Sequence, residues 1–369
     1  MTSEVYINIS KIIEQESKTS TYKFALLRGT IDLILENTHL KKIGGRVHMP
    51  MGLLINKWIF YYYPLLDSNV TIPQIYGNKG IAFGQELKAV ICHYHNKGGK
   101  SVLFKDIRIS SLNKESADMI TKLYKKLQKI ISTMPMRYLG TSVNSSQYSI
   151  YKYHPPKRIY ESYALFDQIS AYGEFSIPSD YFDAFRVLGN FINGQDSIIA
   201  KWADFCWNST KNRAKDKSLI ISRLTDYPIT ARQVNESKTY FRKILQNTEN
   251  IQCVWSGKNI HHSVKYDIDH LLPFSVWRNN DLWNLLPTIP SVNKEKRDRI
   301  PSPERLHESR YRIFNYWDIL YNANEVRFTR EIEQALLGQR ISKDWKEIGI
   351  ARLKDHSEYL ITFRGYEKW

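Results

Sequence analysis

The segment spanning residues 266–302 constrains the fold of this 369-residue chain more than any other segment. An alternating apolar stretch at residues 264–268 predicts a strand that leads into two polar residues, Asp269 and His270. A loop follows, and then a short strand at residues 282–286 and a helix from about Ser291. The sequence therefore predicts strand, loop, strand and helix in that order, with ionisable side chains where the first strand ends.

The polar residues of this segment suit the hydrolysis of a phosphodiester, which needs a base to deprotonate water and a cation to neutralise developing charge. His270 suits the base, because an unperturbed imidazole titrates near ~6.5. Asp269 and Asn293 supply a carboxylate and an amide oxygen, and such hard ligands match Mg²⁺ or Mn²⁺. Adjacent side chains of a strand face opposite ways, so the following turn has to twist to bring Asp269 and His270 together.

Other residues of the segment have supporting roles. Asn284 is expected to stabilise the loop through hydrogen bonds between its side chain and the backbone. Lys296, nearly one helical turn after Asn293, could meet a phosphate or help to fix the site. The basic side chains beside the site are the predicted nucleic-acid contacts: Lys294, Lys296, Arg297 and Arg299.

At these residues the chain resembles the HNH, or ββα-metal, endonuclease family, and the spacing is most similar to the HNH module of RNA-guided CRISPR effector nucleases. An Asn stands 14 residues after His270 and another stands 9 residues further, which is the spacing of that family. The resemblance implies that His270 is the general base, that Asp269 and Asn293 bind the metal, and that Asn284 positions the loop. It covers only the region around residues 253–302, so no guide RNA is inferred.

Many members of this family carry two CxxC knuckles that bind a structural zinc ion. Here the first knuckle reads Cys253-Val-Trp-Ser256, and the second is absent. With one sulfur left, a tetrahedral zinc site is not expected, and packing around Trp255 is expected to stabilise the turn instead.

The charge of the chain indicates its partner. A formal charge of +16 and a pI near 9.5 favour polyanions, because cations that neutralise phosphates release condensed counterions. Nucleic acid, and DNA in particular, is the expected partner. The alternative is that the lysine excess reflects an AT-rich genome or simple solubility, and charge alone does not decide between the two.

Cysteine usage and hydropathy indicate the compartment. Cys92, Cys206 and Cys253 are far apart and odd in number, which predicts no disulfide framework and favours a reducing environment. The N-terminus has no basic start followed by an apolar core, and no window approaches ~18 uninterrupted apolar residues. We therefore expect a cytoplasmic protein with no membrane partner.

The predicted fold class is α+β, with two domains. Residues 1–150 are expected to form a mixed α/β recognition domain, and residues 157–369 a mainly helical domain that carries the nuclease module at about 250–303. A Ser-, Asn-, Tyr- and Pro-rich stretch at residues 134–156 marks the boundary. Residues 101–104 predict a strand. Helices are expected at residues 20–36, 53–63, 117–133, 179–191, 197–207, 232–245, 303–323 and 329–337.

Weaker signals lie elsewhere. Basic and aromatic residues interleave over residues 151–160, where cations could contact phosphates and rings could stack on bases. A second basic run at residues 211–217 is interpreted as a solvated loop. Cys92, His93 and His95 lack the partners that a metal site needs.

The sequence thus predicts a Mg²⁺-dependent endonuclease that hydrolyses DNA, in bacterial restriction or anti-phage defence by analogy with other HNH enzymes. Three alternatives stay open: a homing or mobile-element endonuclease, a catalytically idle DNA-binding protein, and an RNase. One catalytic centre cuts one strand at a time, so double-strand breaks would require a homodimer or two sequential nicks.

Overall fold

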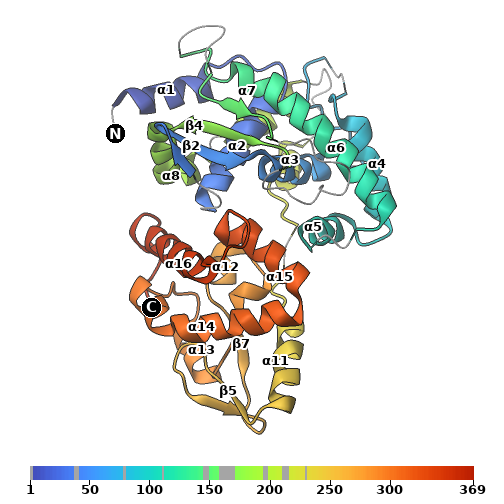
Figure 1. The fold of residues 1–369 in the computed structure, drawn as a ribbon. Coiled ribbons are helices and arrows are strands. Elements are labelled where there is room, and N and C mark those ends of the chain that lie inside the picture. Colours follow the sequence, from blue (N-terminus) through green and yellow to red (C-terminus); the bar gives the residue numbers. More distant parts are fainter. Residues whose placement is uncertain are drawn as a thin grey trace. The chain divides into compact units, whose positions relative to one another are not determined.

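A computed structural model describes residues 3–36, 41–77, 80–109, 112–143, 149–157, 171–193, 198–209, 216–228 and 231–369. The chain divides into two compact units, Met1–Pro228 (unit 1) and Ile229–Trp369 (unit 2). Both are mostly helical and carry small sheets (Figure 1). No helix in the described ranges has the length and apolar character that crossing a bilayer requires.

Unit 1 contains a four-stranded antiparallel sheet in the order β1, β2, β4, β3. Its strands are β1 (Lys41–Ile43), β2 (Arg46–Pro50), β3 (Lys152–His154) and β4 (Glu174–Pro178). In β2 and β4, Val47 pairs with Ile177 and Met49 with Phe175, and all four side chains are buried on one face. The domain boundary expected between residues 150 and 157 therefore lies inside unit 1, because β3 and β4 complete the sheet that β2 begins.

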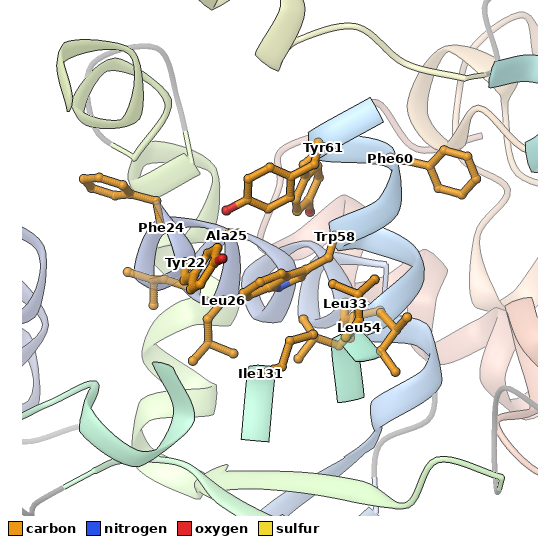
Figure 2. Close-up of a cluster of buried hydrophobic side chains, with 14 of the residues drawn as sticks. Tyr22, Phe24, Ala25, Leu26, Leu33, Leu54, Trp58, Phe60, Tyr61 and Ile131 are labelled. Carbon is orange, nitrogen blue, oxygen red and sulfur yellow. The ribbon is translucent and has the colours of Figure 1, made fainter. Parts of the chain in front are cut away.

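The helices of unit 1 surround this sheet and build the core. Their bounds are α1 (Ser3–Glu14), α2 (Tyr22–Leu35), α3 (Met51–Leu66), α4 (Gly84–His95), α5 (Gly99–Ile109), α6 (Lys114–Thr133), α7 (Pro135–Tyr138), α8 (Ser179–Asn193), α9 (Ile198–Asn208) and α10 (Lys217–Leu224). Figure 2 shows α2 and α3 crossing around Trp58, with Leu26, Leu54 and Ile131 beside it. Gly29 lies at this crossing, where a Cβ atom would stand 2.6 Å from Leu54 Cδ1, so a larger residue would require the Leu54 side chain to shift.

One predicted strand of unit 1 is wrong. Residues 101–104 lie inside α5, with Leu103 and Ile107 buried one helical turn apart. The short apolar run is compatible with the periodicity of a strand or of a helix. Burial of both residues of the i, i+4 pair favours the helix. The helices predicted at residues 20–36, 53–63 and 117–133 are confirmed as α2, α3 and α6.

Unit 2 contains two small hairpins among helices. The hairpins join β5 (Asn250–Gln252) to β6 (Asn259–His261) and β7 (Asp267–His270) to β8 (Leu285–Thr288). The helices are α11 (Asn235–Asn247), α12 (Phe274–Trp277), α13 (Pro290–Lys296), α14 (Pro303–Ala323), α15 (Glu325–Ile332) and α16 (Trp345–Thr362), with a 3₁₀ turn η2 (Leu282–Asn284) and a π-helical turn η3 (Glu333–Leu337). Trp283, Trp317 and Leu353 are fully buried among them.

Several expected boundaries in unit 2 shift by a few residues. The strand predicted at residues 264–268 begins at Asp267, because Val264 N–H donates to His261 O at 2.9 Å and closes a turn. The strand predicted at residues 282–286 starts as η2, because Asn284 N–H donates back to Asp281 O at 3.0 Å. The helix at residues 303–323 is confirmed as α14.

Glu16 ties the α1–α2 connection to the turn after α7. Its side chain is buried and accepts hydrogen bonds from Lys23 Nζ at 2.6 Å, Thr141 Oγ1 at 2.9 Å and Ser142 Oγ at 2.6 Å. Burial raises the pKa of Glu16, but these donors outweigh burial and lower it to about 2. The carboxylate therefore stabilises unit 1 at neutral pH.

We predict that Glu16→Gln lowers the free energy of unfolding of unit 1 by about 2–3 kcal/mol at pH 7. The folded pKa lies below the unfolded value, so this stabilisation is present above the ordinary glutamate pKa of 4.5 and is lost as the pH falls toward about 2. Urea unfolding at several pH values measures the difference. The exposed Glu14 gives the matched control Glu14→Gln, and a pH-independent gap between wild type and Glu16→Gln would contradict the assignment.

Candidate nuclease site

The β7–β8 hairpin and α13 position the polar residues that the sequence singles out. In the hairpin, Asp269 pairs with Leu286 and His270 with Leu285, and α13 follows β8 after one connecting residue. The order strand, loop, strand and helix is therefore as predicted. Asp269 and His270 lie within β7 rather than after it, so their side chains point to opposite sides of the strand and contact different groups.

His270 is buried, with 1% of its surface exposed. Its Nε2 lies 3.2 Å from Asn280 Oδ1, and Nδ1 is buried without a hydrogen-bond partner in the described ranges. Burial, and then the positive charge of Arg232, lower the pKa of His270 to about 4. The imidazole is therefore neutral at pH 7, which is the form that can accept a proton.

Asp269 is buried and paired with Lys296. Lys296 Nζ lies 2.9 Å from Asp269 Oδ2 and 3.1 Å from Oδ1, and the indole of Trp255 donates to Oδ2 at 2.6 Å. Lys296 also donates to the backbone carbonyl of His270. Burial lowers the pKa of Lys296, and the charge of Asp269 opposes this shift. Of the two roles predicted for Lys296, its complete burial favours fixing the site over contact with a phosphate.

Asn293 contacts an acidic residue that received no role from the sequence. Asn293 Nδ2 donates to Asp267 Oδ2 at 3.1 Å, and both side chains are half-buried. Asp267 stands two residues before Asp269, so both carboxylates share one face of β7. This spacing was the signal that could have identified Asp267 as a third oxygen donor.

Asn284 is completely buried beneath the loop that joins β7 to β8. Its Oδ1 accepts from Leu272 N at 2.9 Å, and its Nδ2 donates to Leu272 O at 3.2 Å and Asn279 O at 3.3 Å. Its own carbonyl accepts from Leu271 N at 2.8 Å. These bonds are those of a residue that fixes the loop, and they leave no exposed atom for a metal or a substrate.

The other predicted phosphate contacts lie at or after the end of α13. Lys294 and Arg297 are exposed, and Arg299 is half-buried. Arg297 adopts a positive φ of 53° at the end of the helix, and Arg299 Nε donates to Lys296 O at 3.4 Å. Lys294 and Arg297 are thus available to solvent, whereas Lys296 is enclosed.

The knuckle turn at residues 253–257 is stabilised by packing and hydrogen bonds. Gly257 N donates to Cys253 O at 2.9 Å. Gly257 adopts a positive φ of 70°, a conformation that is unfavourable for residues with a Cβ atom. Arg312 Nε donates to Val254 O at 2.7 Å. The ring of Trp255 lies 5.2 Å from that of Trp369, edge to face. Hydrogen bonds from Ser256 and Thr288 outweigh burial and lower the pKa of the Cys253 thiol.

The donor set around β7 suits a hard divalent cation. In the ranges that the structure covers, no group of three His, Cys, Asp or Glu side chains is placed to hold a metal ion. The oxygens of Asp267, Asp269 and Asn293 nevertheless belong to the chemical class that Mg²⁺ and Mn²⁺ prefer, and Mg²⁺ retains several waters in such sites. Within the described ranges Asp269 Oδ1 accepts one hydrogen bond, which leaves a lone pair for a cation.

Of the weaker sequence signals, those that the structure describes lie in other elements. Cys92, His93 and His95 lie on α4 of unit 1, where His93 Nε2 contacts Ser116 Oγ at 2.8 Å. In the basic and aromatic stretch at 151–160, residues 158–160 lie outside the described residues, as do residues 211–215 of the second basic run. His261 and His262 are exposed at the end of β6, where His261 pairs with Asn250 at the open end of the hairpin.

We predict that Lys296→Ala destabilises unit 2 by about 3–5 kcal/mol, because it leaves the buried carboxylate of Asp269 uncompensated. Lys294→Ala, two residues away and exposed, should change stability by less than ~0.5 kcal/mol. Urea unfolding followed by tryptophan fluorescence measures both, because six of the nine tryptophans lie in residues 229–369. Equal effects of the two substitutions would refute the ion pair.

Comparisons with known proteins agree with this geometry. Residues 2–224 match the model of a family described as a domain of unknown function, DUF8808, and residues 253–302 match one described as HNH endonuclease. The CRISPR-associated endonuclease Cas9 of Listeria innocua serovar 6a (strain ATCC BAA-680 / CLIP 11262) is 28% identical over 103 residues, which are 27% of this chain and span 7% of that protein's length. The predicted resemblance is confirmed: the chain belongs to the DUF8808 family and carries an HNH endonuclease domain at residues 253–302.

Proposed function

We propose that this protein is a divalent-metal-dependent endonuclease that hydrolyses DNA phosphodiester bonds. The observation that carries the proposal is a neutral, buried His270 whose Nδ1 has no hydrogen-bond partner among the described residues, on the same strand as the carboxylates of Asp267 and Asp269. A neutral imidazole with a vacant acceptor is what a general base requires. The HNH family generally uses a divalent metal.

In the proposed reaction, His270 accepts a proton from the attacking water. The water oxygen forms a bond to phosphorus and the bond from phosphorus to the 3′ oxygen breaks. The leaving oxygen takes up a proton from solvent water, so a 5′-phosphate and a 3′-hydroxyl result. Asp269 and Asn293, with Asp267 beside them, would bind the Mg²⁺ or Mn²⁺ ion. When bound, this ion neutralises the charge that develops on the phosphate and on the leaving oxygen. The exposed Lys294 and Arg297 would attract the adjacent phosphates.

Unit 1 supports a role in contacting nucleic acid. Residues 1–228 contain 30 Lys and Arg against 19 Asp and Glu, an excess of 11 of the 16 positive charges of the chain. The face of the sheet opposite the core carries one row across its four strands, formed by Lys41, His48, Ser176 and Lys152. Ser176 is buried, and Glu174 lies 3.1 Å from Lys41 Nζ and 3.3 Å from His48 Nδ1. The exposed Lys152 at the other end of the row suits a phosphate contact that positions a substrate without reading its sequence.

A role in restriction or anti-phage defence is part of the proposal and rests on analogy. An HNH domain joined to a separate basic unit, with partial similarity to a CRISPR-associated endonuclease, supports it. A homing or mobile-element endonuclease would instead cut one long asymmetric site. Mapping the cut sites in a library of DNA sequences separates the two roles, because a homing or mobile-element endonuclease would cut at one long sequence alone.

The test of the activity is cleavage of supercoiled plasmid with Mg²⁺, Mn²⁺ or EDTA. We predict that the wild-type protein nicks the plasmid with metal and not with EDTA, and that His270→Ala lowers the rate by about 10²–10⁴-fold. His262→Ala removes an exposed histidine of the same unit and should leave the rate unchanged.

Parallel reactions on single-stranded DNA and on RNA identify the substrate class. Preferred cleavage of RNA would replace the DNA assignment by an RNase. Binding of DNA without cleavage on any substrate would support an idle DNA-binding protein, and equal cleavage by wild type and His270→Ala would remove His270 from its proposed role.

A further inference from the structure

We propose that Asn280 is a positioning residue that fixes the tautomer of His270, so that Nδ1 is the atom that accepts the proton. The proposal rests on the proposed nuclease function and adds to it the choice of nitrogen and the residue that makes the choice. Asn280 lies in the loop between α12 and η2, ten residues after His270.

The orientation of the Asn280 amide is determined by two backbone groups. Its Oδ1 accepts from Gln233 N at 3.1 Å, and its Nδ2 donates to Ala231 O at 3.0 Å. The reversed amide would bring two donors together at one contact and two acceptors together at the other. The backbone before α11 therefore fixes which atom of Asn280 faces the histidine.

The atom that faces His270 is consequently an oxygen. Asn280 Oδ1 lies 3.2 Å from His270 Nε2 and can only accept, so Nε2 must carry the hydrogen. A neutral imidazole has one N–H group, and the lone pair is therefore on Nδ1. Nδ1 is also the nitrogen that is buried without a partner in the described ranges. The opposite tautomer would turn a lone pair toward Oδ1 and leave a buried N–H group without an acceptor.

The same backbone segment also meets the strand that carries His270. Arg232 Nη2 donates to Ile268 O at 3.0 Å, two residues before His270. Residues 231–233 thus contact both β7 and the residue that orients the imidazole. A tautomer determined in this way does not depend on the substrate, because every partner belongs to the folded chain.

Nitrogen NMR of the full chain, labelled with ¹⁵N at histidine, tests the proposal. The resonances of His270 are assigned as those absent from the spectrum of His270→Ala. At a pH where the ring is neutral, the wild type should show a protonated Nε2 and an unprotonated Nδ1. Asn280→Ala should give a mixture of tautomers, while Asn280→Asp keeps an acceptor and should keep the wild-type tautomer.

Kinetics provide the second readout. We predict that Asn280→Ala lowers kcat for plasmid nicking by about 10–100-fold with KM for DNA within about twofold, because the base is misoriented while DNA contacts stay intact. Gln233→Ala is the matched control, since it removes an exposed side chain and keeps the backbone N–H that Asn280 accepts. It should behave as wild type in both measurements.

The outcomes separate the two proposals. A wild-type protein with the proton on Nδ1, or an Asn280→Ala variant with unchanged tautomer, would overturn the role of Asn280. If the tautomers change as predicted while His270→Ala cuts as well as wild type, the positioning contact is present but the proposed catalytic function fails. Should Asn280→Ala unfold, the tautomer of the wild type and the kcat of Asn280→Asp still decide the question.

Discussion

The ion pair between Lys296 and Asp269 is the interaction on which the HNH domain depends. It joins α13 to β7, and through Asp269 it reaches the indole of Trp255 in the knuckle turn. Each of these two buried charges compensates the other, because either one alone would be a buried charge without a partner of opposite sign. The same ammonium group donates to the His270 carbonyl, so one side chain contacts both the proposed acidic ligand, Asp269, and the residue proposed as the base, His270.

The knuckle turn shows how this domain can be stabilised by contacts from distant parts of the chain. The last residue, Trp369, packs on Trp255, and its backbone N–H donates to Ile300 O at 2.7 Å. Arg312 of α14 donates to the carbonyls of Val254 and Trp255. An aromatic contact, a guanidinium group and a short β-bridge thus surround a turn that many relatives attach to a zinc ion, so the turn can keep its shape through packing.

Much of the site was predictable from spacing, because its key residues are close in sequence. The separations among His270, Asn284 and Asn293 identified the HNH domain, and the comparisons confirm it. Packing around Trp255 was expected, but its hydrogen bond to Asp269 was not predicted, because that contact joins distant parts of the sequence. Asn280 was not identified, because its contacts are with backbone groups at residues 231–233. The expected boundary at residues 150–157 differs from the division between the units for the same reason: strand pairing between residues 46–50 and 174–178 leaves no local signal.

This pairing has a consequence for how the chain is made. While the N-terminal residues leave the ribosome, β1 and β2 can form their hairpin, but the other edge of β2 stays without its partner until β4 has been synthesised, more than a hundred residues later. Contacts so distant in sequence are slow to form, and an unpaired strand edge is open to association with other chains. The native sheet of unit 1 therefore forms only after residues 174–178 have been synthesised, and until then the nascent chain exposes an unpaired edge of β2.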